Sequence, residues 1–137
     1  MLATQAALLS AVVTILAIIL YMTMGFRVGV MRGKHKIDAP AMTGHPELER
    51  AVRVQSNTLE AFPVFLPALW LATIYCDVLG IVPAALGLLW VIGRFLYMQA
   101  YISNPAKRGP GFGICVLALL ALMILTIVGI ARAWSIS

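Results

Sequence analysis

The sequence predicts an all-α integral membrane protein, a four-helix bundle in which each of the four helices spans the membrane. Of its 137 residues, 62% are hydrophobic and only 11% are charged, whereas about a quarter of the residues in an average soluble domain are charged. The apolar residues fall in four runs, each long enough to provide the roughly 20 residues that cross a bilayer. The length therefore accommodates one transmembrane domain over residues 1–137.

The first two helices are predicted over residues 6–31 and 46–75. No basic residue precedes Arg27 in the first run, which therefore lacks the basic start of a signal peptide, and we expect this helix to be retained. The second run begins at Pro46, and proline is favoured in the first turn of a helix. Because backbone groups in hydrocarbon must be satisfied within their own segment, both runs are predicted as helices rather than open strands.

The other two helices are predicted over residues 83–103 and 113–134. Asn104 and Pro105 end the third helix, since the residue before a proline is disfavoured in helical geometry. A short connection rich in glycine and basic residues then leads into the fourth helix.

Basic residues predict the orientation in the membrane. The connections after the first and third helices carry Arg32, Lys34, Lys36, Lys107 and Arg108. The turn between the second and third helices carries only Asp77. The positive-inside rule then places both basic connections in the cytoplasm and both termini outside, and we expect a bacterial inner membrane. The net charge of +5 reflects this topology, so no nucleic-acid partner is expected.

The few histidines and cysteines do not predict a metal site. The chain has no C-x-x-C pair and no histidine cluster in sequence. His35 and His45 are expected to be solvated loop residues, and no metal is expected. Cys76 and Cys115 are expected near opposite faces of the membrane, where they would not form a disulfide.

The second helix carries a polar stripe on an otherwise apolar surface. At 100° per residue, with Arg50 at 0°, Arg53 falls at about 300°, Asn57 at about 340° and Glu60 at about 280°. Gln55 falls near 140°, on another face. The four stripe residues therefore share an arc of roughly 80°.

The third helix carries a second stripe. With Arg94 at 0°, Tyr97 falls at roughly 300°, Tyr101 at roughly 340° and Arg108 at roughly 320° if the helix continues that far. Both stripes lie toward the predicted cytoplasmic side, so they could face each other either within a subunit or across a subunit contact.

Two interpretations of the stripes remain open. Polar residues near helix ends can extend to the interface, and an ion pair such as Arg94 with Glu60 can hold two helices together. Charges within membrane spans are, however, rare and usually functional. The excess of arginine favours an anionic ligand, because guanidinium groups bind carboxylates in a bidentate fashion. Glu60 could hold an ammonium group of the same ligand, and access from lipid would suit an apolar second substrate.

Two segments resemble motifs of a known family. ERAVRVQSNTLEAFPVFLPALW resembles the second-helix signature of the MAPEG proteins, the membrane-associated proteins in eicosanoid and glutathione metabolism. GRFLYMQAYISNPAKR resembles the third-helix motif of that family, in which an arginine precedes two tyrosines four residues apart. The resemblance covers the whole chain in its length, its four-span layout and the order of its motifs.

The resemblance implies homotrimers that bind glutathione between adjacent subunits, near the cytoplasmic side. The residues that it implies for glutathione binding are Arg53, Asn57 and Glu60 on one helix, Arg94, Tyr97 and Tyr101 on the neighbour's, and also Gln55 and Arg32. Arg108 matches the arginine that faces the glutathione sulfur in the leukotriene C4 synthase branch, and it is the expected catalytic residue. A nearby arginine lowers the pKa of a thiol, which is about 8.5 in free cysteine, and so favours the nucleophilic thiolate.

The implied function is that of a membrane-bound glutathione transferase, with glutathione peroxidase as a second activity, acting on lipophilic electrophiles. Ala61 and Gly33 stand where the leukotriene C4 synthase branch has a tyrosine and a second arginine, which argues against a dedicated eicosanoid enzyme. Two alternatives stay open. One is a non-catalytic lipid- or glutathione-binding member of the same family. The other is a small four-helix transporter of cations, which the surplus of arginine disfavours.

Overall fold

The computed structural model describes residues 2–76 and 80–136, so Asp77 lies outside the described residues. Four long helices account for most of this part of the chain, and it contains no strand. They are α1 (Leu2–His35), α2 (Pro46–Tyr75), α3 (Val82–Ser103) and α4 (Gly109–Ile136), with a short 3-10 helix η2 (Pro105–Arg108) before α4. All four are long and apolar enough to cross a membrane. The predicted all-α, four-helix integral membrane fold is confirmed.

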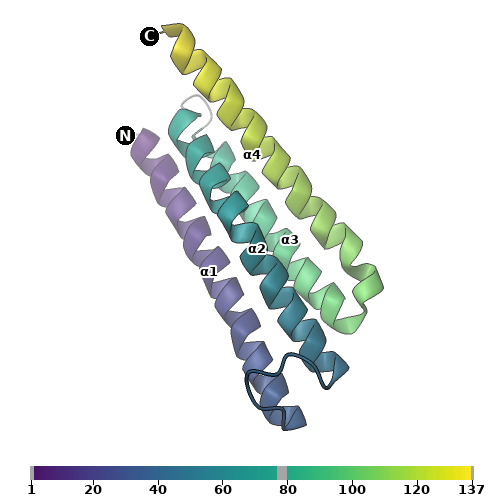
Figure 1. Ribbon diagram of the computed structural model, residues 1–137. Coiled ribbons are helices and arrows are strands. Elements are labelled where there is room, and N and C mark those ends of the chain that lie inside the picture. The colour runs from purple at the N-terminus through teal and green to yellow at the C-terminus, as the bar shows by residue number, and fades with distance from the viewer. Residues whose placement is uncertain (1, 77–79, 137) are drawn as a thin grey trace.

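The four helices form an elongated bundle (Figure 1). α2 and α3 each pack against all three other helices, while α1 and α4 flank them on opposite sides. Both termini lie at one end of the bundle, and the α1–α2 and α3–α4 connections lie at the other. The basic connections therefore share one end, as the charge pattern requires.

Two helices extend beyond the ranges predicted from the sequence. α1 continues to His35, where Lys36 adopts a left-handed φ of 53° and the amide of Ile37 donates to the carbonyl of Arg32 over 3.1 Å. This is the 6→1 closure that commonly ends a helix. α4 begins already at Gly109, which has helical angles (φ −53°, ψ −53°). Pro110 then occupies the first turn, where its missing amide costs no hydrogen bond.

The bundle core is centred on two stacked aromatic rings. The rings of Phe65 and Trp90 lie 3.8 Å apart with planes only 4° from parallel. Leucine, valine and alanine side chains from all four helices surround them. Below this core, toward the connections, Gly111 of α4 lies directly against the backbone of Tyr97 in α3. Small residues of this kind allow membrane helices to approach closely, and here the close approach fixes the position of α4 beside the polar end of α3.

Candidate ligand-binding site

The two polar stripes meet within a single subunit, at one hydrogen bond between α2 and α3. Arg94 Nη1 donates to Asn57 Oδ1 over 2.7 Å. The ion pair considered between Arg94 and Glu60 is not formed. The ion pairs among the described residues are those of Lys34 and His35 with Glu47, and Glu60 is exposed on α2. Asn57 takes the place of Glu60 as the partner of Arg94. Glu60 lies almost one turn further along α2, and its side chain is exposed.

Arg94 is buried behind the site rather than in it. Its side chain is 4% exposed, and its guanidinium lies 5.2 Å from the Trp90 ring and 5.3 Å from the Tyr97 ring. Its Nε finds no hydrogen-bond partner in the described part of the chain. A buried cation is costly unless neighbouring groups compensate its charge. Asn57 and the two aromatic faces provide that compensation, and Arg94 in turn fixes the orientation of the Asn57 amide.

A polar cavity of about 420 Å³ opens beside this contact, and we call it the arginine cavity. Its walls come from α2, α3, η2 and α4, and its lining residues are Arg53, Asn57, Tyr97, Tyr101, Arg108 and Phe112. Five of these six were predicted as site residues from the sequence. Two guanidinium groups and no carboxylate are among the described residues that line it, so the cavity is suited to an anion.

Local structure at the end of α3 brings Arg108 to the arginine cavity. Asn104 ends α3 in an extended conformation, and its Oδ1 accepts a hydrogen bond from the amide of Ala106 (3.0 Å), which starts η2. Arg50 Nη1 donates to the carbonyl of Ile102 over 3.2 Å and so ties α2 to this turn. Arg108 then lies with its guanidinium 5.8 Å from the Tyr101 ring. The tight 3-10 turn replaces the continued helix that the stripe assumed.

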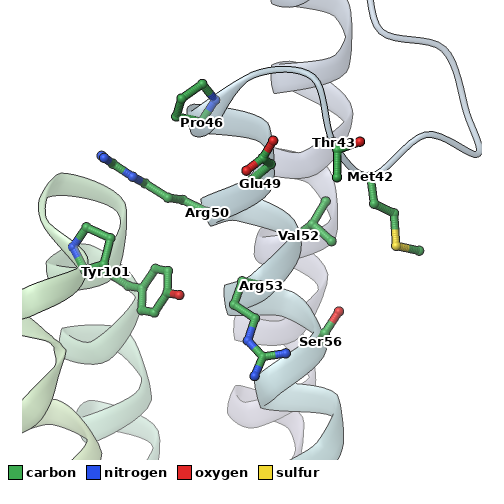
Figure 2. A pocket seen from close by; sticks show the side chains of 10 residues that line it. Met42, Thr43, Pro46, Glu49, Arg50, Val52, Arg53, Ser56 and Tyr101 are labelled. Atoms are coloured by element: carbon green, nitrogen blue, oxygen red, sulfur yellow. The ribbon is translucent and has the colours of Figure 1, made fainter.

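A second cavity of about 490 Å³ adjoins the first on the side of the α1–α2 connection, and we call it the loop cavity. Figure 2 shows Arg50 and Arg53 extending from α2 and Tyr101 extending from the neighbouring helix, α3. The lining residues are Met42, Thr43, Pro46, Glu49, Arg50, Val52, Arg53, Ser56, Tyr101 and Pro105. Arg53 and Tyr101 line both cavities, so they separate the two.

Besides the buried Arg94, three residues predicted for the site line neither cavity of the single subunit. Glu60 is exposed on the outer face of α2. Gln55 faces α1, since a Cβ placed on Gly25 would lie 3.0 Å from Gln55 Nε2. Arg32 lies at the end of α1, where its Nη1 donates to the carbonyl of Asp38 over 3.2 Å. One subunit therefore brings together only part of the predicted set.

Sequence reasoning missed Phe112 and most residues of the loop cavity. Phe112 lies before the predicted start of the fourth helix, so no helical spacing connected it with Arg108, and only the early start of α4 at Gly109 brings it to the cavity. Met42 and Thr43 carry no signal in the sequence either, because their position depends on how the α1–α2 connection folds over α2.

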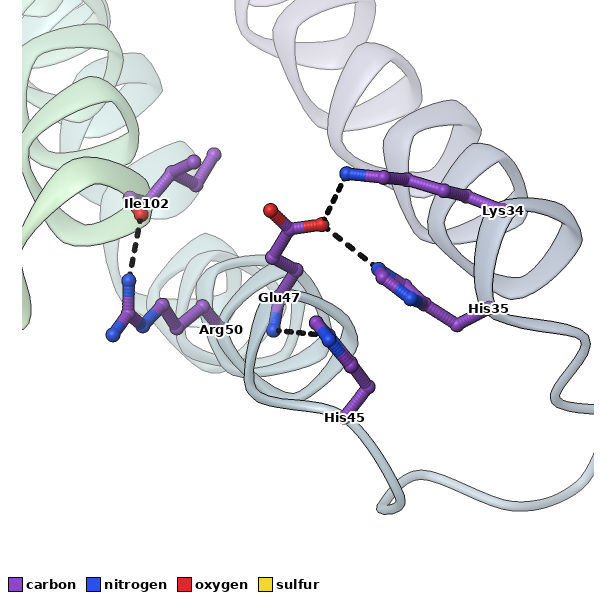
Figure 3. Close-up of polar contacts among 6 residues, drawn as sticks. All are labelled: Lys34, His35, His45, Glu47, Arg50 and Ile102. Atoms are coloured by element: carbon purple, nitrogen blue, oxygen red, sulfur yellow. Dashed lines mark hydrogen bonds and ion pairs between the residues drawn. The ribbon is translucent and has the colours of Figure 1, made fainter.

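His35 is not the loop residue expected from the sequence, whereas His45 does lie in the α1–α2 connection, and both side chains are partly buried. His35 is the last residue of α1, its side chain is 15% exposed, and its ring stacks on that of His45 at 3.4 Å (Figure 3). Possible metal-ligand atoms of His35, His45 and Glu47 all lie within 4.8 Å of one another. Lys34 Nζ, however, already lies 2.6 Å from Glu47 Oε2, so a cationic group occupies that carboxylate.

Comparison with known proteins identifies relatives along most of the chain. The MAPEG family profile matches residues 10–128. The chain is 41% identical over 114 residues to the uncharacterized protein sll1147 of Synechocystis sp., covering 83% of this chain and 82% of the relative. It is 36% identical over 127 residues to human microsomal glutathione S-transferase 2, covering 93% and 85%. It is 35% identical over 100 residues to leukotriene C4 synthase of Cavia porcellus, covering 73% and 65%.

Proposed function

Because this chain belongs to the MAPEG family, we propose that it is a membrane-bound glutathione transferase that joins the thiolate of glutathione to lipophilic electrophiles. The observation that carries the proposal is the arginine cavity, which gathers two guanidinium groups, an amide and two phenols where α2, α3 and α4 meet. Its volume of about 420 Å³ lies within the range of about 300–1,000 Å³ that is usual for small-molecule sites.

The charges of glutathione complement those of the site. Glutathione carries two carboxylates and one ammonium group, so it needs more cationic than anionic partners. Arg53 and Arg108 supply the cations in the arginine cavity, and Asn57, Tyr97 and Tyr101 supply polar contacts. Arg94 holds Asn57 in place through the 2.7 Å hydrogen bond. Each charge-assisted hydrogen bond contributes about 1.5–3 kcal/mol, so two or three such bonds are enough for micromolar to millimolar affinity.

Arg108 is the proposed catalytic residue. A guanidinium beside the thiol of glutathione favours the thiolate, which is the nucleophile. In the reaction with 1-chloro-2,4-dinitrobenzene, the thiolate sulfur forms a bond to the ring carbon that bears chlorine. Chloride then leaves with the electrons of the C–Cl bond, and the thiol proton passes to solvent. Phe112 adds an apolar wall beside Arg108 where such an electrophile packs.

The active assembly in this proposal is a homotrimer in a bacterial inner membrane, with its basic end in the cytoplasm and its termini outside. An exposed carboxylate such as Glu60 is costly against lipid, and a subunit contact that covers it removes this cost. In this proposal Arg32 and Gln55, which line neither cavity of one subunit, complete the glutathione site in the trimer. Native mass spectrometry in mild detergent is expected to detect a trimer, and a stable monomer or dimer would contradict this assembly.

The decisive experiment compares glutathione binding with conjugation in detergent-purified protein. The wild type is expected to bind glutathione, to conjugate 1-chloro-2,4-dinitrobenzene and, as a second activity, to reduce lipid hydroperoxides. Arg108→Ala should lower turnover and raise the pKa of the bound thiol, which is visible as lost thiolate absorbance, while glutathione affinity falls much less. A shift of one pKa unit corresponds to about 1.4 kcal/mol.

Arg53→Ala is the control, because Arg53 lines both cavities and its loss should weaken binding first. Binding without any turnover in the wild type would indicate the non-catalytic alternative. An absence of glutathione binding would refute the proposed function as a whole. Unchanged turnover and an unchanged thiolate titration in Arg108→Ala would make Arg108 an interfacial anchor only.

A further inference from the structure

The junction of α1 and α2 holds both histidines of the chain in face-to-face contact. The rings of His35 and His45 stack with centroids 3.4 Å apart and planes 15° from parallel. His35 Nε2 lies 2.8 Å from Glu47 Oε2, and Lys34 Nζ lies 2.6 Å from the same oxygen (Figure 3). Two groups that change charge near neutral pH are therefore packed against the start of α2.

His45 is also the N-cap of α2. Its backbone is extended (φ −154°, ψ 135°), and its Nδ1 accepts a hydrogen bond from the backbone amide of Glu47 over 3.2 Å. The usual N-cap residues are Ser, Thr, Asp and Asn. A ring nitrogen can accept this hydrogen bond only while it carries no proton, and histidine acquires its second proton between about pH 8 and 5.

We propose that His45 is a proton-sensitive cap, which releases the first turn of α2 when its ring becomes charged. Protonated Nδ1 is a donor that faces the amide donor of Glu47, and the positive charge lies at the positive end of the helix dipole. The ring of His35 stacks on that of His45, and two positively charged imidazole rings in contact repel each other. Each of these effects opposes the capped geometry in the charged form and is absent in the neutral form.

Of the surrounding charges, the Glu47 carboxylate lies within 4.8 Å of a His45 ring nitrogen and opposes this effect, but Lys34 and His35 already contact that carboxylate. The charged and titratable groups at the junction are Arg32, Lys34, His35, Lys36, Asp38, Glu47, Glu49 and Arg50. The Glu47 carboxylate contacts Lys34 and His35 through its Oε2 atom. The contact that His45 makes with Glu47 is to the backbone amide. Because Lys34 and His35 occupy the carboxylate, the hydrogen bond from the Glu47 amide decides how charge on the His45 ring affects the cap.

Release of the cap changes the wall of the loop cavity. Met42, Thr43 and Pro46 form that wall, and Pro46 directly follows the cap residue. The amide of Gly44 donates to Glu49 Oε1 over 3.2 Å, so part of the connection stays attached to α2 whatever the state of His45. The predicted motion is therefore a local opening beside Arg50 and Arg53. This inference does not depend on the identity of the ligand.

A metal ion is the competing occupant of the junction. A zinc site of this kind needs two imidazole lone pairs that converge on one point. Rings that stack within 15° of parallel direct their nitrogens along parallel planes, and Lys34 already pairs with the carboxylate. The geometry thus favours a proton over a metal.

Hydrogen–deuterium exchange of the detergent-purified protein tests the proposal at about pH 7.5 and pH 5.5, with exchange corrected for the intrinsic chemical rate. In the wild type, the exchange rate of the amides in the first turn of α2 is expected to rise about fivefold at the lower pH. This is the fold-change that corresponds to the loss of an N-cap, which stabilises a helix by about 1 kcal/mol. His45→Asn keeps a favourable cap that does not titrate, so the rise should be absent. His35→Gln should retain the rise.

Two results would overturn the proposal. One is an equal rise in His45→Asn or no rise in the wild type. The other is stoichiometric zinc binding to the wild type, measured by calorimetry at about pH 7.5, that His45→Asn abolishes. Should His45→Asn fail to fold, His45→Ser provides the same cap without a titrating ring.

Discussion

Replacing Gly111 with alanine should separate α3 from α4, whereas the same change at Gly113 should not. A Cβ on Gly111 would lie 2.5 Å from the backbone nitrogen of Tyr97, 2.8 Å from its Cα and 2.9 Å from the carbonyl oxygen of Gly93. Comfortable contacts between such atoms are about 3.5–4.0 Å, so the helices would have to move apart by about 1 Å. A Cβ on Gly113 meets no described atom within 4 Å.

The expected magnitudes follow from two opposing effects. Alanine is about 1 kcal/mol more favourable than glycine within a helix. Overpacking typically costs about 1–3 kcal/mol, and the cost at Gly111 should be at the upper end because the obstructing atoms belong to backbone and cannot rotate away. Gly111→Ala should therefore destabilise the fold by about 2 kcal/mol, and Gly113→Ala should stabilise it by about 1 kcal/mol.

Unfolding in mixed detergent and sodium dodecyl sulfate micelles, followed by circular dichroism, measures both variants against the wild type. Gly111→Ala should unfold at a lower fraction of dodecyl sulfate, and Gly113→Ala at an equal or higher fraction. Gly111→Ala should also impair glutathione conjugation, since α3 and α4 carry opposite walls of the arginine cavity. If Gly111→Ala proves as stable as Gly113→Ala, the close approach of the two helices is wrong, and so is the cavity geometry derived from it.

Two further predictions concern the stripe on α2. In the proposed trimer, Glu60 holds the ammonium group of glutathione. Glu60→Gln removes this charge-assisted contact and should weaken glutathione binding about ten- to a hundredfold. An unchanged dissociation constant in folded, trimeric protein would leave Glu60 a structural role only. Asn57→Ala should lower the free energy of unfolding by about 1.5–3 kcal/mol, because buried Arg94 loses its hydrogen-bond acceptor. Ser56→Ala is the matched control, since Ser56 lines only the loop cavity, and an equal loss in both variants would refute the role assigned to Asn57.

The sequence by itself determined the fold class and most of the arginine cavity. Four apolar runs of spanning length leave helices as the only segments that satisfy their own backbone in hydrocarbon. Polar residues are so unusual within such runs that their spacing alone identified Arg53, Asn57, Tyr97 and Tyr101, all of which line the cavity. This information is local, because it depends on the helical period and on the cost of polarity in lipid.

Only the tertiary structure decided how these helices meet. The stripe pattern allowed an ion pair between Arg94 and Glu60. The way in which α2 and α3 cross instead places Asn57 at Arg94, where it accepts a hydrogen bond. Gly111 and Gly113 look equivalent in sequence, yet only Gly111 lies against the backbone of a neighbouring helix. Such pairings depend on the relative rotation and separation of whole helices, which are set by packing between segments distant in sequence. Spacing within one helix carries no record of them.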